Sequence, residues 1–252
     1  MKKVHFTDKY ILNPTHPITI NLVGVGGTGS QVLTSLARIN HALIALGHPG
    51  LHIAAYDPDE VTQANIGRQQ FSMVDLGLNK ATVLVTRVNR FFGFDWEAFP
   101  SLYRYKQPAN IMISCVDSVK SRLVIADAID KRANGVDYQR MMYWIDFGNG
   151  INHGQVVLGT LECIEQPKSK QFETVPEMKV VTELFDLSQV DEADSGPSCS
   201  LPEALRKQDM FINSTLAQLG CALLWKLLST GSIDYQGLFL NLDTMKVNPI
   251  KL

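Results

Sequence analysis

The chain lacks paired cysteines, paired histidines and any cluster of positive charge. Its four cysteines are widely scattered without a Cys-x-x-Cys pair, which argues against both a disulfide scaffold and a zinc knuckle. No two of its six histidines stand at zinc-ligand spacing on a helical face. The formal net charge is −2, and no run of Lys or Arg forms a stripe. We therefore expect no nucleic-acid partner.

Long apolar runs are also missing. The most apolar window, Gly220 to Leu228, is interrupted by Lys226 and is too short to span a bilayer. The opening Met-Lys-Lys leads into polar residues rather than an apolar stretch, which does not support a secretory signal. We expect a cytoplasmic protein with no membrane partner. With 45% apolar residues, the 252-residue chain is long enough for one sizeable core, and we expect one domain over 1–252.

Hydrophobic periodicity alternates between strand and helix through the first two thirds of the chain. The patterns predict a fold of the α/β class: a Rossmann-like mixed sheet with helices on both faces, parallel in its N-terminal half and more antiparallel in its C-terminal part. A polar, Pro-containing stretch from Glu162 to Asp209 separates a nucleotide-binding part, 1–161, from a C-terminal helix and strands, 210–252. A loop this long in a compact chain is usually functional or mobile. The predicted strands are 18–23, 51–56, 110–116, 142–147, 155–161 and 237–242, and the predicted helices are 30–46, 80–92, 118–133 and 211–228.

A glycine-rich turn joins the first of these strands to the first helix. Its sequence is Gly24-Val25-Gly26-Gly27-Thr28-Gly29. Glycines let the backbone approach phosphates, and a helix N-terminus favours a bound anion. The turn thus predicts a nucleotide site, with Gly24, Gly26, Gly27 and Gly29 as binding residues. A tight turn without a ligand is the alternative.

Asp57 stands at the end of the second predicted strand. An acidic side chain there can accept the hydroxyls of a ribose. NAD and ATP sites both place an acid at this point, so Asp57 does not separate them. Its other interpretation is a turn-forming Asp before Pro58.

Arg68 and Lys80 favour ATP over NAD. Arg68 lies in the run Asn65-Ile66-Gly67-Arg68-Gln69, and Lys80 stands at the start of the helix predicted at 80–92. Attack of a carboxylate on the α-phosphate of ATP builds negative charge on that phosphate and on departing pyrophosphate, and cations aimed there lower the barrier. Hydride transfer needs no such pair. The alternative is an ordinary surface Arg and a helix-starting Lys.

Asp117 follows the strand predicted at 110–116. This places it at the carboxyl edge of the sheet, where open α/β sheets bind their ligands. A carboxylate there can hold Mg²⁺ together with phosphates and water. It can also cap the helix that begins at Ser118, and the two roles are compatible.

In combination these residues resemble the ThiF/MoeB/HesA family, the bacterial relatives of ubiquitin-activating enzymes. The glycine turn, Asp57, the Asn65 to Gln69 run, Lys80 and Cys115-Val116-Asp117 occur in that family's order and at roughly its separations. Gly154-Gln155-Val156 also resembles the family's strand after the Mg-binding Asp. Within the family, the chain looks most like the ThiF-related proteins of PRTRC plasmid gene cassettes, which also encode a ubiquitin-like protein.

The resemblance implies an enzyme that uses ATP and Mg²⁺ to adenylate the C-terminal carboxylate of a small ubiquitin-like protein. Arg68 and Lys80 would contact the phosphates and Asp117 the Mg²⁺, with Asn65 and Gln69 as further phosphate-side candidates. The tail of the ubiquitin-like protein would enter beneath the 162–209 loop. In relatives, such a loop can carry a nucleophilic cysteine that forms a thioester. Cys199 is the candidate here and Cys163 its rival. Relatives are dimeric, which implies a homodimer.

Two family features are absent from this chain. Relatives usually bind structural zinc through two Cys-x-x-Cys pairs, which this chain lacks. They also carry an Arg ahead of the first strand that reaches the partner subunit's site, whereas residues 1–17 contain no Arg. Lys2, Lys3 and Lys9 are possible substitutes, although Lys cannot make a bidentate phosphate contact. This absence keeps open a non-catalytic module that binds a ubiquitin-like protein and ATP. An NAD-dependent oxidoreductase is the third hypothesis.

Overall fold

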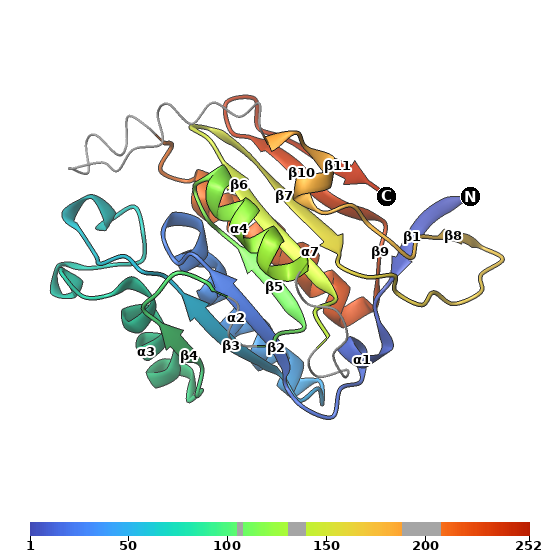
Figure 1. Cartoon of the computed structure of the whole chain (residues 1–252), viewed down its shortest axis with the longest axis horizontal. Helices are drawn as coiled ribbons and strands as arrows, with labels where there is room; N and C mark the ends of the chain where they lie inside the picture. Colours follow the sequence, from blue (N-terminus) through green and yellow to red (C-terminus); the bar gives the residue numbers. More distant parts are fainter. Residues whose placement is uncertain (105–107, 131–139, 188–207) are drawn as a thin grey trace.

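An eight-stranded mixed sheet forms the centre of the molecule (Figure 1). The structure is a computed structural model that describes residues 1–104, 108–130, 140–187 and 208–252. The strand order across the sheet is β11-β10-β7-β6-β5-β2-β3-β4. The strands are β2 (Ile18–Val23), β3 (Leu51–Tyr56), β4 (Glu97–Phe99), β5 (Ile111–Ser114), β6 (Tyr143–Asn149), β7 (His153–Thr160), β10 (Tyr235–Asn241) and β11 (Lys246–Lys251).

The two halves of this sheet differ in strand direction. Adjacent strands pair parallel from β4 through β3, β2 and β5 to β6, whereas they pair antiparallel from β6 through β7 and β10 to β11. The connections explain the difference. Helical crossovers link β2 to β3 and β5 to β6, whereas a short turn at 150–152 links β6 to β7. The predicted mixed sheet is confirmed.

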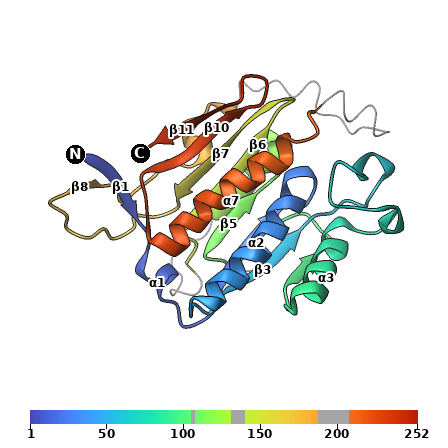
Figure 2. The ribbon, with the colours of Figure 1, turned by 180° about the vertical axis from the view of Figure 1, so that it is seen from behind.

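Helices cover both faces of the sheet. Helices α2 (Gly27–Ala45), α3 (Lys80–Phe92) and α7 (Ile212–Thr230) lie on one face, with α2 and α7 side by side (Figure 2). Helix α4 (Val119–Asp130) crosses the other face (Figure 1). Each face has its own apolar core. Leu33 of α2 and Leu224 of α7 belong to the first, and Ile125 of α4 and Trp144 of β6 to the second.

A smaller, three-stranded sheet contains the N-terminus. Strand β1 (Lys2–Phe6) lies between β8 (Phe172–Thr174) and β9 (Ser232–Ile233). The remaining short elements among the described residues are α1 (Lys9–Leu12), α5 (Val181–Leu184) and two 3₁₀ turns, η1 (Gln63–Asn65) and η2 (Met73–Asp75). Because β9 directly follows α7, the small sheet lies beyond the C-terminal end of that helix.

Most predicted elements recur with nearly the predicted bounds, including 18–23, 51–56 and 80–92. Two boundaries were wrong. Helix α2 begins at Gly27, inside the glycine turn, rather than at Ser30. The strand predicted at 142–147 continues to Asn149 in β6, because Gly148 and Asn149 pair with Gln155 and Gly154 of β7.

Candidate functional site

The glycine turn and Asp117 follow two neighbouring strands, β2 and β5, at the topological switch point of the sheet. Strands β2 and β5 are neighbours, and the chain leaves them toward opposite faces, through α2 and α4. Open α/β sheets bind ligands in the crevice at such a switch point. Gly24 marks the close approach of the two loops. It has a φ of 86°, and a Cβ there would stand 2.8 Å from the Cys115 carbonyl oxygen.

The rest of the turn brings the start of α2 into the crevice. A Cβ at Gly29 would stand 1.9 Å from the Gly24 carbonyl oxygen, so only glycine allows this tight packing. Gly26 is the N-cap residue of α2 and has no side chain to cap it. The first amides of a helix have no acceptor within the helix. The uncapped end of a 19-residue helix therefore offers N–H donors and partial positive charge to an anion.

Asp57 supports this turn from the end of β3. Its Oδ2 accepts the Val25 N–H at 2.7 Å, and its Oδ1 accepts the Asp59 N–H at 2.9 Å. The side chain is buried, and burial raises the pKa of its carboxyl, while the Val25 amide and Lys80 act in the opposite direction. Both oxygens are thus used to shape the loops. Contact with a ribose, which a carboxylate oxygen's second lone pair permits, stays a prediction.

Arg68 and Gln69 present buried polar atoms without partners. Among the described residues, Arg68 Nε and Gln69 Oε1 are buried and have no hydrogen-bond partner. The Gln69 amide lies across from Gly26, because a Cβ on Gly26 would stand 3.8 Å from Gln69 Oε1. Burial lowers the pKa of Arg68, yet a guanidinium stays charged at neutral pH. Leaving such groups unpaired costs about 1–3 kcal/mol each, which a polar ligand would recover.

Asn65 has a local role in the same segment. Its Oδ1 accepts the N–H of Thr62 at 2.9 Å and the Thr62 hydroxyl at 3.1 Å, which closes η1. The side chain is buried. Asn65 therefore fixes the turn that presents Arg68 and Gln69, and a direct phosphate contact stays a prediction.

Lys80 brings a buried ammonium to the other side of Asp57. Its Nζ lies 2.9 Å from Asp59 Oδ2, and only 10% of the side chain is exposed, against 63% for Asp59. Helix α3 begins here because the Asn79 side chain caps it by accepting the Thr82 N–H. The partner of this ammonium is thus an exposed carboxylate, which an anionic phosphate can replace.

Asp117 is exposed just beyond β5. Ser118 caps α4, since its Oγ accepts the Ser121 N–H at 3.1 Å. The carboxylate of Asp117 forms no ion pair or hydrogen bond with any part of the chain that the structure describes. It fits Mg²⁺, which takes one or two carboxylates and completes its shell with phosphate oxygens and water.

A buried ion pair next to Asp117 escaped the sequence analysis. Arg122 Nε lies 3.1 Å from both oxygens of Asp146, and the two side chains are 9% and 1% exposed. Arg122 Nη2 also donates to the Val116 carbonyl at 2.8 Å. The pair therefore ties β6 to the loop that carries Asp117. The sequence predicted only that Asp146 lies in a strand and that Arg122 lies in a helix.

Of the two candidate nucleophiles, Cys163 and Cys199, only Cys163 lies among the described residues. Cys163 is exposed. Cys199 lies outside the described residues. Cys221 is buried in α7, and burial raises the pKa of its thiol to about 12, which makes it unsuitable as a nucleophile.

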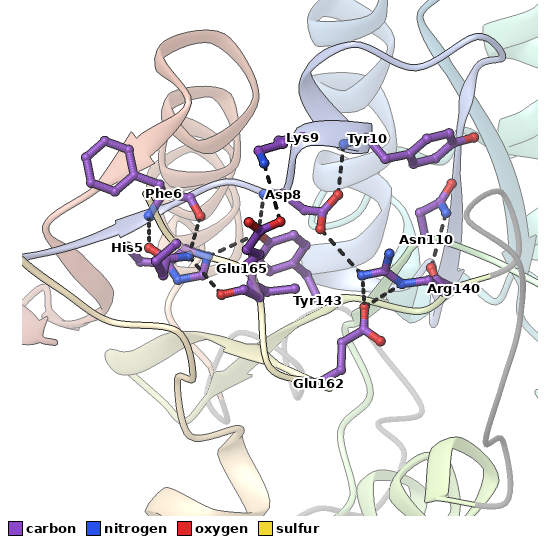
Figure 3. A network of polar contacts seen from close by, with 12 residues as sticks. His5, Phe6, Asp8, Lys9, Tyr10, Asn110, Arg140, Tyr143, Glu162 and Glu165 are labelled. Carbon is purple, nitrogen blue, oxygen red and sulfur yellow. Dashed lines mark hydrogen bonds and ion pairs between the residues drawn. The ribbon is translucent and has the colours of Figure 1, made fainter. Parts of the chain in front are cut away.

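The N-terminal segment is bound to its own chain (Figure 3). The buried His5 ring contacts the Val175 carbonyl at 2.7 Å and the Tyr143 hydroxyl at 3.0 Å, and the same hydroxyl accepts the Asp8 N–H. Two of the candidate lysines form ion pairs here, Lys2 with Asp234 and Lys9 with Glu165. Helix α7 separates this region from the glycine turn by roughly 28 Å, at 1.5 Å per residue. These lysines do not reach their own chain's site.

The described residues include neither a cluster of metal ligands nor a membrane-spanning helix. They contain no group of three or more His, Cys, Asp or Glu side chains placed to hold a metal ion. None of their helices is long and apolar enough to cross a membrane.

Comparison with known proteins identifies the family. The model of the ThiF family matches residues 15–248. The chain belongs to the ThiF family. Ubiquitin-like modifier-activating enzyme 5 of Branchiostoma floridae is 23% identical over 201 residues, and that of Drosophila erecta is 25% identical over 186 residues. These matches cover 72% and 66% of this ThiF chain but only 44% and 41% of the relatives, so the chain spans less than half of their length.

Solved structures support the same fold. E. coli MccB with succinimide superposes with a TM-score of 0.58 at 17% identity, covering 93% of this chain and 63% of MccB. PaaA gives a TM-score of 0.57 at 14% identity, covering 93% and 64%. MccB crystallised with ATP gives 0.55 at 17% identity, covering 96% and 64%. The predicted Rossmann-like fold of the ThiF type is confirmed.

Proposed function

We propose that this protein uses Mg-ATP to adenylate the C-terminal carboxylate of a small ubiquitin-like protein. One observation carries the proposal. At the switch point of the sheet, the uncapped start of α2 meets the unpartnered Arg68 Nε and Gln69 Oε1 atoms, with the Lys80 ammonium beside Asp57. Such a crevice suits a polyanion. Membership of the ThiF family and relatives named as ubiquitin-like modifier-activating enzymes favour ATP as that anion.

The proposed reaction is transfer of the adenylyl group of ATP to the substrate carboxylate. A carboxylate oxygen of the substrate attacks the α-phosphorus, the bond to the bridging oxygen breaks, and pyrophosphate leaves with the electron pair. Negative charge grows on the pyrophosphate, and fixed cations lower the barrier because their positions need no reorganisation. Arg68 and Lys80 have that role. Mg²⁺, held by Asp117, would neutralise phosphate charge.

The proposed substrate is a small ubiquitin-like protein. The relatives' name points to a ubiquitin-like protein, and the resemblance to PRTRC plasmid cassettes points to the ubiquitin-like protein that such cassettes encode. MccB has been crystallised with MccA, which shows that this fold admits a second polypeptide in one relative. A homodimer is part of the proposal through the same resemblance.

The test is ATP–pyrophosphate exchange. Wild-type protein with Mg²⁺ and the candidate ubiquitin-like protein should exchange label, and Lys80→Ala should reduce exchange by at least about a hundredfold, the effect typical of a transition-state cation or donor. Lys226→Ala is the matched control, since Lys226 is paired with Asp234 near the far end of α7. Absence of exchange by wild type despite ATP binding would overturn adenylation. Absence of ATP binding would also overturn the nucleotide site.

A thioester step would follow if a thiol attacks the adenylate and releases AMP. Cys199 is the proposed nucleophile. After reaction with ATP and the ubiquitin-like protein, a thiol-sensitive adduct should form in wild type and in Cys163→Ser, and should be absent in Cys199→Ser. An adduct lost only in Cys163→Ser would reassign the role.

A non-catalytic binding module is the second candidate. The observation in its favour is the N-terminal segment, which contains no Arg and is bound to its own chain through His5 and Asp8 (Figure 3). This candidate expects ATP and the ubiquitin-like protein to bind without pyrophosphate exchange, so the same assay separates the two.

A further inference from the structure

Two neutral amide side chains connect Arg68 to the glycine turn. The Oε1 atom of Gln208 accepts an N–H from Arg68 Nη1 and another from Asn213 Nδ2, the latter at 2.8 Å. Asn213 Oδ1 in turn accepts the Thr28 hydroxyl at 2.8 Å. An unbroken series of hydrogen bonds therefore runs from the guanidinium to the first turn of α2.

The orientation of Asn213 in this series is fixed from several sides. The residue is 3% exposed, and its Oδ1 also accepts Asn149 Nδ2 at 3.0 Å. A Cβ on Gly27 would stand 2.9 Å from its side chain, so α2 and α7 meet here without spare room. An inverted amide would place the Asn213 NH₂ against the Asn149 NH₂, and the Oδ1-to-Thr28 orientation is therefore the favoured one.

Gln208 is held just as firmly. Its Nε2 donates to the Gly150 carbonyl at 3.3 Å, which turns Oε1 toward Arg68 and Asn213. The next residue, Asp209, donates its N–H to the Ile151 carbonyl at 2.7 Å. The segment that leads into α7 is thus anchored on the turn between β6 and β7, and the Gln208 amide oxygen is directed toward Arg68.

This arrangement suits a charged side chain that must keep some donors unpaired. A carboxylate at position 208 would pair with Arg68 and cancel its charge, whereas a neutral amide oxygen fixes one nitrogen and leaves the charge available. Arg68 Nε is left buried without a partner among the described residues. The pyrophosphate end of ATP carries most of the negative charge of the nucleotide, so it is the part that the free Arg68 donors would bind.

We infer that Gln208 is a positioning residue for Arg68: it holds the guanidinium against the glycine turn so that its other donors face the pyrophosphate end of ATP. The inference rests on the proposed function, because it takes ATP as the ligand. Asn213 extends the effect to α2, so that one series of hydrogen bonds aligns the cation with the helix N-terminus.

The test compares ATP with AMP, which lacks the pyrophosphate end. Calorimetric titration with Mg²⁺ and each nucleotide should show about tenfold weaker ATP binding for Gln208→Leu and an AMP affinity within about twofold of wild type. A general loss of structure would weaken both nucleotides. Gln166→Leu is the matched control: this glutamine makes similar bonds, to the backbone of Phe6, at the far end of the molecule, and its loss should leave the ATP-to-AMP ratio unchanged.

A double-mutant cycle separates positioning from an independent contact. If Gln208 acts through Arg68, Arg68→Ala and the double variant Arg68→Ala/Gln208→Leu should bind ATP equally, because nothing is left to position. Gln208→Ala repeats the comparison with a smaller side chain. Wild-type ATP affinity in both Gln208 variants, or additive losses in the double variant, would overturn the inference alone. Failure of wild type to bind ATP would overturn the proposed function and the inference with it.

Discussion

Asp57 and Val25 fix the shape of the glycine turn: the carboxylate of the one accepts the backbone N–H of the other at 2.7 Å, from the end of the adjacent strand. The same carboxylate also accepts the Asp59 N–H, so a single buried group joins two loops. Its burial raises the pKa of the carboxyl, whereas the hydrogen bonds from Val25 and Asp59 and the charge of Lys80 stabilise its ionised form.

Asp57→Asn should damage both the crevice and the fold. An amide has one acceptor oxygen, so either the Val25 or the Asp59 N–H faces an NH₂ group, at a cost of about 1–3 kcal/mol. ATP affinity should fall at least about tenfold. The melting temperature should fall by about 2–4 °C per kcal/mol lost. Asp234→Asn, which loses two ion pairs far from the crevice, should leave ATP affinity unchanged. Wild-type ATP binding by Asp57→Asn would contradict the role of this contact.

Asp117→Asn tests the proposed Mg²⁺ site. The exposed carboxylate has no partner in the described chain, so its loss should leave the melting temperature within about 1 °C of wild type, as is usual for surface substitutions. The Mg²⁺ concentration for half-maximal pyrophosphate exchange should rise about tenfold or more, because an amide oxygen is a weaker ligand for a hard cation. Asp95→Asn, at a side chain that is 96% exposed, is the control. An unchanged Mg²⁺ requirement would remove Asp117 from the site.

Arg122→Met should make folding stability depend strongly on pH. Removal of one partner from a buried ion pair typically costs about 3–5 kcal/mol. Burial already raises the pKa of Asp146, and without Arg122 the pKa would rise further. A carboxyl whose folded pKa lies above its unfolded value of about 3.9 loses stability as pH rises through the folded pKa. The variant should therefore be less stable to urea at pH 8 than at pH 5.

The control for this substitution is Arg87→Met. Arg87 pairs with Asp75 and is 46% exposed, whereas Asp75 is 7% exposed. The Asp75 carboxylate would keep the hydrogen bonds from the Ser72 N–H and hydroxyl, so the loss should be smaller than for Arg122. In the double variant Arg122→Met/Asp146→Leu, the difference between pH 5 and pH 8 that Arg122→Met introduces should disappear. If that difference persists in the double variant, Asp146 is not its source.

The local structure around the continuous motifs could be predicted from the sequence. The strand, glycine turn and helix at 18–45 are local, because apolar periodicity and glycines determine them within 30 residues. Lys80 was likewise placed correctly at the first position of a helix, since Asn79 before it is a helix cap. The contacts of Arg68 and Lys80 with phosphate remain predictions.

Contacts between distant segments could not be predicted in this way. Arg68 and Gln208 are 140 positions apart, and Thr28 and Asn213 are 185 apart, so no periodicity connects them. Strand β1 was missed because a five-residue segment in which Lys2 and Lys3 are exposed has no apolar alternation of its own. It forms because β8 and β9 supply the hydrogen-bond partners on both sides.

His5 should make the attachment of β1 sensitive to mild acid. Its ring donates to the Val175 carbonyl, so the other nitrogen accepts the Tyr143 hydroxyl, and this assignment requires a neutral ring (Figure 3). Burial lowers the pKa of His5, while the Val175 carbonyl and Asp8 partly oppose that effect. Below about pH 6.5 the unfolded chain therefore binds more protons than the folded chain, and stability is lost as pH falls.

The measurement is urea unfolding of wild type, His5→Asn and His41→Asn at pH 7.5 and pH 5.5. For a fully suppressed protonation, His5 contributes a loss of about 1.4 kcal/mol between these pH values. His5→Asn should be less stable than wild type at pH 7.5, since the Tyr143 hydroxyl loses its acceptor, yet its stability should fall less toward pH 5.5. His41→Asn changes an exposed histidine and should follow wild type. An equal fall in wild type and His5→Asn would show that the acid sensitivity arises elsewhere.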